Sequence, residues 1–324
     1  MRVCVTGGTG FVGGALVRRL VAEGSQVRVL ARPSPRADEL EAKGAEVVRG
    51  DLSDGAAIQR AVEGAEVVYH IAAKVEGHGS RDQFFETNVG GTERVLAASL
   101  RAKARRVVHL SSIAVYGLTA ADTAINEVTP FDDVPEDRDF YAQSKIEADR
   151  LAMTIGADTE MGVTILRPGV IYGPGRPLPT ALLGARIRKL DFVFGRPEQP
   201  FPLNYIENLI DAMTVVARVA DRVSRQFIVI DDEALTLGQY HAARAKVQRT
   251  WTMFFPARPV VMAATCARPV MRLVLANTGA FSRRQILRAS QDRWYDTRRI
   301  RGETGWAPKV PLRDAIERTV RGAF

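Results

Sequence analysis

The chain has 324 residues, of which 25% are charged and 46% hydrophobic, and its formal net charge is +8. These values are typical of a globular protein with one large domain, or with one domain and a smaller lobe. The arginines are scattered, which argues against a nucleic-acid partner, while the net charge favours anionic ligands. Two cysteines without a metal-binding spacing predict neither a disulfide framework nor a metal site. The chain opens on a predicted strand and has no apolar run of bilayer length, so we expect a cytoplasmic protein without a signal peptide.

Predicted strands and helices alternate through the first half of the chain. The predicted strands are 2–6, 26–30, 46–49, 66–71, 106–110 and 163–166. The predicted helices between them are 15–22, 38–43, 54–62, 83–102 and 141–155. This alternation with short connections predicts an α/β fold with a doubly wound parallel Rossmann sheet.

The regular alternation ends after residue 168, where prolines and glycines cluster. We expect one more strand at 203–206, a helix at 207–219, and a strand at 226–230 that returns to the main sheet. The prediction is therefore a dinucleotide-binding domain over 1–172, to which 203–230 return. Residues 173–202 and 231–324 would form a smaller, mostly helical substrate lobe.

A glycine-rich turn joins the first strand to the first helix, in the sequence Gly-Gly-Thr-Gly-Phe-Val-Gly over residues 7–13. Gly7 permits a tight turn, Gly10 lets the backbone approach a pyrophosphate, and Gly13 lets the helix pack close to the strand. The free N–H groups and the dipole at the start of a helix favour phosphate. We therefore predict a dinucleotide site whose contacts here are Gly7, Thr9, Gly10, Phe11 and Val12.

The end of the second strand indicates which nicotinamide cofactor binds. An acidic residue there binds the ribose 2′-OH of NAD, whereas an arginine accommodates the 2′-phosphate of NADP. Residues 26–37 contain no acid but include Arg32. A guanidinium binds phosphate in a bidentate manner, so NADP(H) is favoured over NAD(H). The alternative is that Arg32 is only a solvated loop charge.

The third strand is followed by Asp51 and Leu52, where the adenine of a bound dinucleotide is expected to lie. Asp51 can accept a hydrogen bond from the exocyclic amine. An ordinary turn or helix-capping acid remains an equally good interpretation of Asp51.

Tyr141 and Lys145 are spaced to lie on one face of a helix. Reduction of a carbonyl by hydride transfer requires a proton donor, and a nearby ammonium would lower the pKa of the tyrosine towards the working range. Ser111 and Ser112 follow the predicted strand 106–110, at the sheet edge where ligands bind in open α/β folds. We therefore predict that Tyr141 is the acid/base, Lys145 its electrostatic partner and ribose anchor, and Ser112 the group that holds the carbonyl.

These motifs together resemble the extended short-chain dehydrogenase/reductase family, within the NAD-dependent epimerase/dehydratase superfamily. Ser112, Tyr141 and Lys145 match its Ser-Tyr-Lys set, and Asn88 matches the helix asparagine that supports the lysine. The resemblance implies cofactor contacts at two further places. They are the strand end Ala72, Ala73 and Lys74, and the segment Pro168, Gly169 and Val170 beside the nicotinamide. Ser111, Tyr141 and Lys145 would contact the cofactor as well. The family pattern runs from residue 1 to about 205 and resumes at 304–309.

Within this family, residues 72–79, Phe84, Phe85 and 88–92 look like the 3β-hydroxysteroid dehydrogenase branch, its bacterial β-keto acid reductase relatives and the dihydroflavonol reductases. Residues 201–208 lack the arginine that usually meets the nucleotide phosphate in the sugar-modifying enzymes. The resemblance thus implies an NADP(H)-dependent oxidoreductase that interconverts a secondary alcohol and a ketone on an apolar, steroid-like, flavonoid-like or long-chain β-keto acyl substrate. Two alternatives remain, a nucleotide-sugar epimerase or dehydratase with bound NAD, and a non-catalytic NADP(H)-sensing protein.

Three interpretations of the apolar stretch 251–276 stay open: a cover over the substrate, a helix on a membrane surface, and ordinary core. His70 lies in a predicted buried strand and is interpreted as structural, and His78 lies in a loop that would line the substrate pocket. By analogy with the family, helices 83–102 and 141–155 would pair in a homodimer.

Overall fold

The computed structural model describes residues 1–75, 79–117, 124–132, 139–176, 178–179, 184–256 and 292–322. Its first elements are β1 (Arg2–Thr6), α1 (Phe11–Ala22), β2 (Gln26–Ala31), α2 (Pro35–Ala42), β3 (Glu46–Arg49), α3 (Gly55–Val62) and β4 (Val67–His70). Next come α4 (Arg81–Phe85), the π-helix η1 (Glu86–Gly90), α5 (Gly91–Arg101), β5 (Arg106–Leu110), the 3₁₀ turn η2 (Ile113–Val115), α6 (Phe140–Asp158) and β6 (Gly162–Pro168). The later elements are β7 (Val170–Tyr172), β8 (Gly184–Ile187), β9 (Leu190–Phe194), β10 (Leu203–Tyr205), α7 (Ile206–Arg218), β11 (Arg225–Val229), α8 (Leu237–Gln248), β12 (Trp251–Phe255), α12 (Arg298–Thr304) and α13 (Leu312–Arg321).

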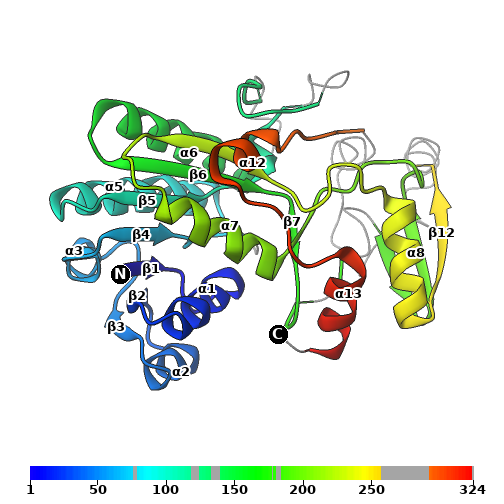
Figure 1. The fold of residues 1–324 in the computed structure, drawn as a ribbon, viewed down its shortest axis with the longest axis horizontal. Helices are drawn as coiled ribbons and strands as arrows, with labels where there is room; N and C mark the ends of the chain where they lie inside the picture. The colour runs from blue at the N-terminus through cyan, green and yellow to red at the C-terminus, as the bar shows by residue number, and fades with distance from the viewer. Residues whose placement is uncertain are drawn as a thin grey trace.

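Seven parallel strands form the main sheet in the order β11-β6-β5-β4-β1-β2-β3 (Figure 1). This order confirms the predicted doubly wound Rossmann topology. The strand order reverses between β1 and β4, which is where ligands bind in such sheets. The strand at 226–230 that we expected to return to the sheet does so, since β11 pairs with β6. The bounds of the two domains stay a prediction.

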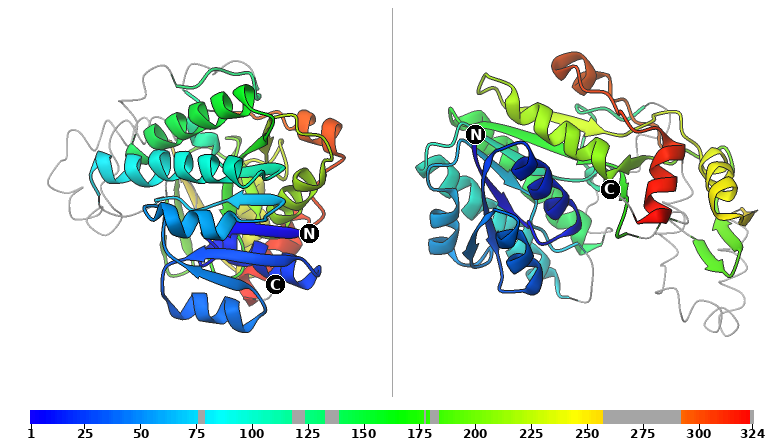
Figure 2. Two further views of the ribbon diagram at one scale, coloured as in Figure 1. Left: turned by 90° about the vertical axis from the view of Figure 1, so that its left-hand side faces the viewer. Right: turned by 60° about the horizontal axis from the view of Figure 1, so that its bottom comes forward.

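The sheet is covered on both faces, as nearly continuous apolar strands require. Alternate residues of β1 supply two separate cores: Val3 and Val5 pack with α1 and α7, whereas Cys4 packs with α3 and α5. Cys4 is fully buried in this second core. Figure 2 shows these helices as layers on the two sides of the sheet.

The lobe beyond the carboxyl ends of the strands was expected to be mostly helical, but it contains a three-stranded sheet in the order β12-β9-β8. The helices α8, α12 and α13 agree with that prediction, and the sheet is an element that the sequence did not predict. Residues 251–255, whose character was left open, form β12. Residues 257–276 lie outside the described residues. None of the helices in the described part of the chain combines the length and hydropathy that a membrane span requires.

The predicted helix 83–102 contains a π-helical turn over Glu86–Gly90. Such a turn inserts one residue into the helical repeat and is frequent at functional sites. Here it carries Asn88, which is 2% exposed.

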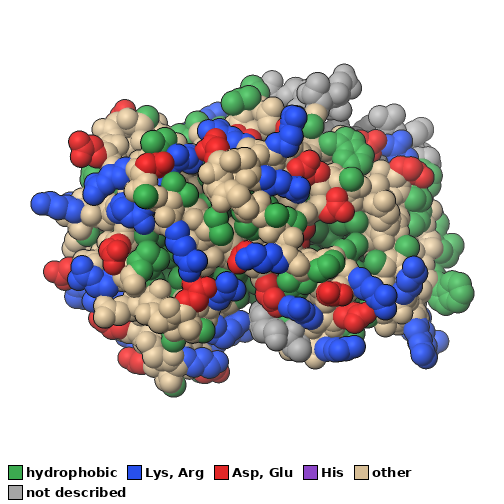
Figure 3. Space-filling model, viewed as in Figure 1, with side chains coloured by type: hydrophobic (Ala, Val, Ile, Leu, Met, Phe, Trp, Pro, Cys, Tyr) green, Lys and Arg blue, Asp and Glu red, His purple; other side chains and the backbone are tan. Residues whose placement is uncertain are grey.

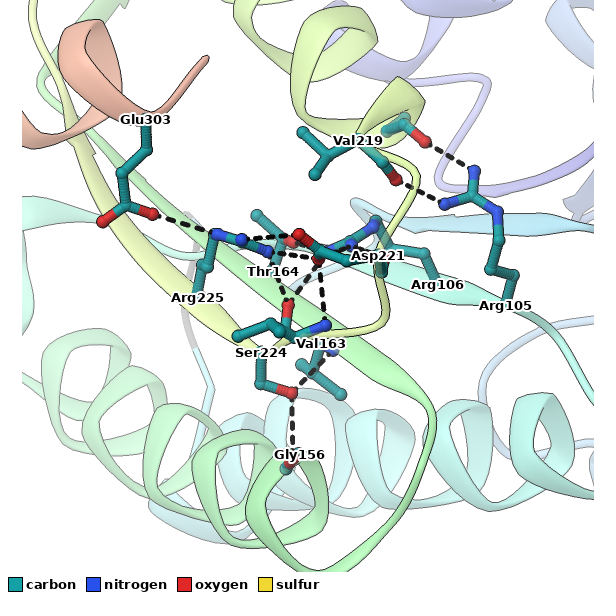
Figure 4. A network of polar contacts seen from close by, with 12 residues as sticks. Arg105, Arg106, Gly156, Val163, Thr164, Val219, Asp221, Ser224, Arg225 and Glu303 are labelled. Carbon is teal, nitrogen blue, oxygen red and sulfur yellow. Dashed lines mark hydrogen bonds and ion pairs between the residues drawn. The ribbon is translucent and has the colours of Figure 1, made fainter.

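At the amino ends of the strands, opposite the carboxyl ends where ligands are expected, arginines connect the sheet to the end of α7 (Figure 4). Arg106, fully buried at the start of β5, donates to Thr164 Oγ1 on β6 at 2.6 Å and pairs with Asp221. Arg105 donates to the carbonyls of Ala217 and Val219, which end α7. These bonds hold the connection from α7 to β11 against the amino ends of β5 and β6, so the cations here stabilise the fold.

Candidate active site

The sheet brings the predicted site residues to one edge. The glycine turn follows β1, Arg32 follows β2, and Asp51 and Leu52 follow β3. On the other side of the reversal, Ala72, Ala73 and Lys74 follow β4, and Ser111 and Ser112 follow β5. Pro168, Gly169 and Val170 lie at the end of β6. A nucleotide lying across the point where the strand order reverses would therefore meet both groups.

The glycine turn forms a cradle that side chains would fill. Gly7 has a φ of +76°, and a Cβ there would lie 2.7 Å from the Ala72 nitrogen. A Cβ on Gly13 would lie 2.1 Å from the Gly7 carbonyl oxygen. Gly10 is exposed at the N-cap of α1 and has no side chain with which to cap the helix. The turn therefore fits a pyrophosphate on the first N–H groups of α1, as predicted.

Arg32 is exposed and lies close enough to Asp51 to lower the pKa of its carboxyl. The larger cause of that lowering is the hydrogen bond with the Ser53 side chain, 2.6 Å from Asp51 Oδ1. These contacts favour the interpretation of Asp51 as an ordinary turn acid. Its position after β3 still lies at the end of the site where the adenine is expected. Arg36, which the prediction did not include in the site, reaches back to the Thr9 carbonyl at 3.4 Å. Arg32, near Asp51, and Arg36, at the glycine turn, therefore both lie at the predicted adenosine end of the site.

Asn88 joins three segments around the site. Its Oδ1 accepts from the Lys74 backbone nitrogen at 2.7 Å, and its Nδ2 donates to the Lys74 carbonyl at 3.0 Å. The same Nδ2 also donates to Ser144 Oγ at 2.9 Å, on the residue before Lys145. Asn88 thus fixes the segment after β4 and the middle of α6, so it orients Lys145 through its neighbour.

Ser112, which follows β5, and Tyr141 on α6 come close enough for the serine hydroxyl to lower the pKa of the phenol. Ser112 also caps η2, because its Oγ accepts from the Ala114 nitrogen at 3.1 Å. Burial raises the pKa of Tyr141 to about 12, opposed by the Ser112 hydroxyl and the charge of Arg176. The net shift is opposite to the lowering expected from Lys145. The reason is that desolvation of the phenolate dominates and the charges of Asp139 and Asp149 add to it, while the groups that lower this pKa are Ser112 and Arg176 rather than Lys145.

Lys145 is 3% exposed and donates from Nζ to the Leu110 carbonyl at 2.8 Å, at the end of β5. Burial lowers its pKa to about 8, and the nearby Asp149 opposes this by favouring the ammonium. Tyr141, Lys145 and Asp149 are four residues apart along α6 and so share one face.

A buried polar network lies behind Lys145. Asp149 is fully buried and accepts from Arg167 Nε on β6 at 2.9 Å. Its other carboxylate oxygen lies 3.6 Å from His109 Nε2 on β5. Arg167 also donates to the Tyr116 hydroxyl at 2.8 Å. Arg167 thus compensates the charge of the carboxylate buried beneath the lysine, and sequence reasoning missed this network because its members are distant in the chain.

His70 is 1% exposed, and its ring nitrogens lie 2.8 Å from Thr6 Oγ1 and 2.9 Å from Thr92 Oγ1. Burial holds its pKa well below the usual range. These contacts agree with the structural interpretation of His70. His78 lies outside the described residues.

Arg176, which the prediction omitted, follows β7 and lies with its guanidinium 5.7 Å from the centre of the Phe11 ring. Its charge also lowers the pKa of Tyr141. The Gly169 nitrogen nearby donates to Asn204 Oδ1 at 2.6 Å, which fixes the segment Pro168, Gly169 and Val170 against β10. A cation directly after the Gly-Pro-Gly turn at 173–175 was the only sequence signal for Arg176.

A family model described as "NAD dependent epimerase/dehydratase family" matches residues 3–230. The 2-alkyl-3-oxoalkanoate reductase of Stenotrophomonas maltophilia is 30% identical, with 98% of each chain covered. The protein of the same name from Shewanella oneidensis is 31% identical over 72% of this chain, and the match spans only 63% of that protein. The 3 beta-hydroxysteroid dehydrogenase/Delta 5-->4-isomerase of Mycobacterium tuberculosis is 30% identical over 84% of this chain and 72% of its own.

Among solved structures, MoeE5 in complex with UDP-glucose and NAD matches with a TM-score of 0.74 and 23% identity. The match covers 99% of this chain and 98% of that one and shows the fold. The relatives confirm the resemblance to the 3β-hydroxysteroid dehydrogenase and β-keto acid reductase branch. On the extent of the family match and of the Stenotrophomonas relative, the chain belongs to the NAD-dependent epimerase/dehydratase family, which is the extended short-chain dehydrogenase/reductase family.

Proposed function

We propose that the protein is an NADP(H)-dependent oxidoreductase that interconverts a secondary alcohol and a ketone on a largely apolar substrate. The observation that carries the proposal is that Ser112 and Tyr141 come together at the carboxyl end of β5, close enough for the serine hydroxyl to favour the phenolate, with Lys145 one helical turn away. A protein that only senses the cofactor has no need of this arrangement.

The nicotinamide ring, when bound, supplies or accepts the hydride. During reduction, Tyr141 Oη holds the proton that passes to the carbonyl oxygen, and Ser112 Oγ donates a second hydrogen bond to that oxygen. The raised pKa of Tyr141 keeps the phenol protonated at neutral pH, which suits a proton donor. Lys145 places a positive charge beside the oxygen, where negative charge develops in the transition state.

Arg32 and Arg36 support NADP(H) as the cofactor. Both lie on the segment after β2, and Arg36 reaches the glycine turn. A 2′-phosphate between two guanidinium groups would make charge-assisted bonds, whereas the 2′-OH of NAD would find no carboxylate in residues 26–37.

The names of the relatives support an apolar substrate class. Two are 2-alkyl-3-oxoalkanoate reductases and one is a 3 beta-hydroxysteroid dehydrogenase/isomerase. All of these names describe a ketone or secondary alcohol within a hydrocarbon framework. We therefore place 2-alkyl-3-oxoacyl compounds first, and steroid and flavonoid ketones after them.

The test is the substitution Tyr141→Phe, assayed by NADPH oxidation with a panel of these ketones. Loss of the proton donor should reduce kcat by about 10²–10⁴-fold, while NADPH affinity measured by calorimetry stays within about threefold. The matched control is Tyr205→Phe, which removes a hydroxyl bonded to Glu207 on α7. It should leave kcat unchanged.

Near-full turnover of Tyr141→Phe would remove the tyrosine from the mechanism. Wild-type protein that binds NADPH tightly and turns over none of the ketones would instead support the cofactor-sensing alternative. Copurified NAD that resists dialysis would support the nucleotide-sugar epimerase or dehydratase.

A further inference from the structure

The three-stranded sheet of the lobe has two different faces. One face packs against α8: Thr252 on β12 lies 3.2 Å from His241, and Asp191 on β9 pairs with Arg244. Side chains alternate along strands, so the neighbouring residues point to the other face. That face consists of apolar residues in register across β8, β9 and β12, namely Ile187, Leu190, Phe192, Phe194, Trp251, Met253 and Phe255.

Exposure of this face is greatest at one end. Trp251 is 75% exposed and Ile187 62%, whereas Phe192, Phe194 and Phe255 are half-buried and stack on one another. A tryptophan this exposed is unusual, because tryptophan side chains are highly buried on average. We name this end the lobe tip and define it as Ile187, Leu190 and Trp251 together with the adjacent cations Arg188, Lys189 and Arg249.

The cations lie directly beside the exposed apolar side chains. Arg188 and Lys189 form the turn between β8 and β9, and the Lys189 carbonyl accepts from the Trp251 nitrogen at 2.8 Å. Arg249 ends α8 two residues before Trp251. In the described part of the chain, no carboxylate pairs with any of these three. Figure 3 shows hydrophobic and basic side chains together at the right-hand edge, where Figure 1 places β12 and α8.

The backbone at two of these cations is unusual as well. Arg188 has a φ of +54° and Arg249 a φ of +52°, a left-handed conformation that glycine adopts at less cost. A glycine would avoid the cost of about 1–2 kcal/mol that an L-residue pays in this conformation.

We propose that the lobe tip docks the protein on an anionic phospholipid surface. An exposed tryptophan favours the interfacial layer of a bilayer, and basic residues around it bind acidic headgroups. An anionic surface complements three unpaired cations better than a neutral protein partner would. The proposal does not depend on the reaction catalysed, so it can fail or succeed separately from the proposed function.

The experiment is vesicle co-sedimentation of the full chain, comparing pure phosphatidylcholine with vesicles that contain about 30 mol% phosphatidylglycerol. Each cation near such a surface should change the partition coefficient by about fivefold, so three together predict a preference of about 10²-fold for the anionic vesicles. Salt at about 0.5 M should remove most of this preference.

Three variants locate the contact. Trp251→Ser should reduce binding to both kinds of vesicle, whereas the double change Arg188→Ser and Lys189→Ser should reduce only the preference for anionic lipid. Trp294→Ser, which removes a 40% exposed tryptophan outside the tip, is the matched control and should bind like wild type. Brominated lipids should quench the fluorescence of Trp251, as seen by comparing wild type with Trp251→Ser.

Several results would overturn the proposal. One is the absence of sedimentation with anionic vesicles at low salt, and another is equal binding of wild type and Trp251→Ser. Self-association that disappears in Trp251→Ser would show that a second copy covers the tip. A markedly lower melting temperature of Trp251→Ser would show that the chain itself covers it.

Discussion

Lys145 is the residue whose surroundings most directly control the proposed chemistry. Its ammonium is buried, which lowers its pKa to about 8, and the only buried carboxylate described near it is Asp149, one turn further along α6. Asp149 is held in turn by Arg167. The charged form of Lys145 is therefore stabilised by a carboxylate that lies one turn further from Tyr141 along α6.

The lowered pKa predicts how stability depends on pH. Between pH 8 and 10.5 the unfolded chain still holds the lysine proton, which the folded chain has released, so stability increases as pH rises through this window. Below pH 8 the full cost of the buried charge is present. Lys145→Met lacks this cost and should be more stable than wild type at pH 7, by as much as about 3 kcal/mol, with the difference shrinking towards pH 10.

Denaturant unfolding at pH 7, 8.5 and 10 measures this difference. The exposed Lys43 at the end of α2 supplies the control Lys43→Met. Its free energy of unfolding should differ from that of wild type by an amount that does not change between pH 7 and 10. A Lys145→Met difference that is constant across the window would mean that the lysine is not desolvated as described.

At the scale of elements, Asn208 on α7 connects β11 to the C-terminal segment. Its Oδ1 accepts from the Lys309 and Val310 nitrogens at 3.0 and 2.9 Å. Its Nδ2 donates to Asp231, directly after β11, at 3.0 Å. Burial raises the pKa of Asp231 to about 7 despite three hydrogen bonds to its carboxylate.

We predict that Asn208→Asp destabilises the protein increasingly as pH rises. The new carboxyl keeps the acceptor but loses the donor and lies against Asp231, so both folded-state pKa values are raised above the unfolded ones. Stability from this pair is then lost between about pH 4 and 8, and the penalty at pH 8 should reach about 3 kcal/mol.

Urea unfolding of Asn208→Asp at pH 5 and pH 8 tests this prediction. The control is Asn126→Asp, because within the described residues the Asn126 side chain accepts hydrogen bonds, from the Val128 and Thr129 nitrogens and the Thr129 hydroxyl, and donates none, so aspartate can take its place. An Asn208→Asp penalty that is equal at both pH values would contradict the like-charge argument.

The sequence predicted the main sheet well because its strands are buried on both faces and separated by short helices. The lobe sheet escaped prediction for a physical reason. In β9 the buried residues are Val193 and a carboxylate, Asp191, which pairs with Arg186 and Arg244, while the half-exposed residues are all apolar. The usual polar-outside alternation is therefore inverted. Arg176 and the Asp149 network were missed for another reason, since only the fold brings their partners together. The homodimer stays a prediction.

At the scale of the whole molecule, a bound dinucleotide would connect the two halves of the main sheet. Its adenosine end would lie over β1, β2 and β3, and its nicotinamide end over β4, β5 and β6. A ligand that binds only the folded chain stabilises it in proportion to the logarithm of its concentration over Kd. Thermal unfolding therefore reports cofactor preference for the intact protein, without any knowledge of the substrate.

We predict that NADPH raises the melting temperature more than NADH does at equal concentration. At 100 times its Kd, NADPH should contribute about 2.7 kcal/mol, a rise of several degrees for a chain of this length. If the 2′-phosphate gains about tenfold in affinity from the arginines, NADH should contribute about 1.4 kcal/mol less. Arg32→Ala should remove most of this difference, whereas Arg101→Ala, which changes an exposed arginine on α5, should keep it. Equal shifts by the two cofactors in wild type would make Arg32 an ordinary surface charge. The nucleotide-sugar alternative, with its bound NAD, would then become the better account of the site.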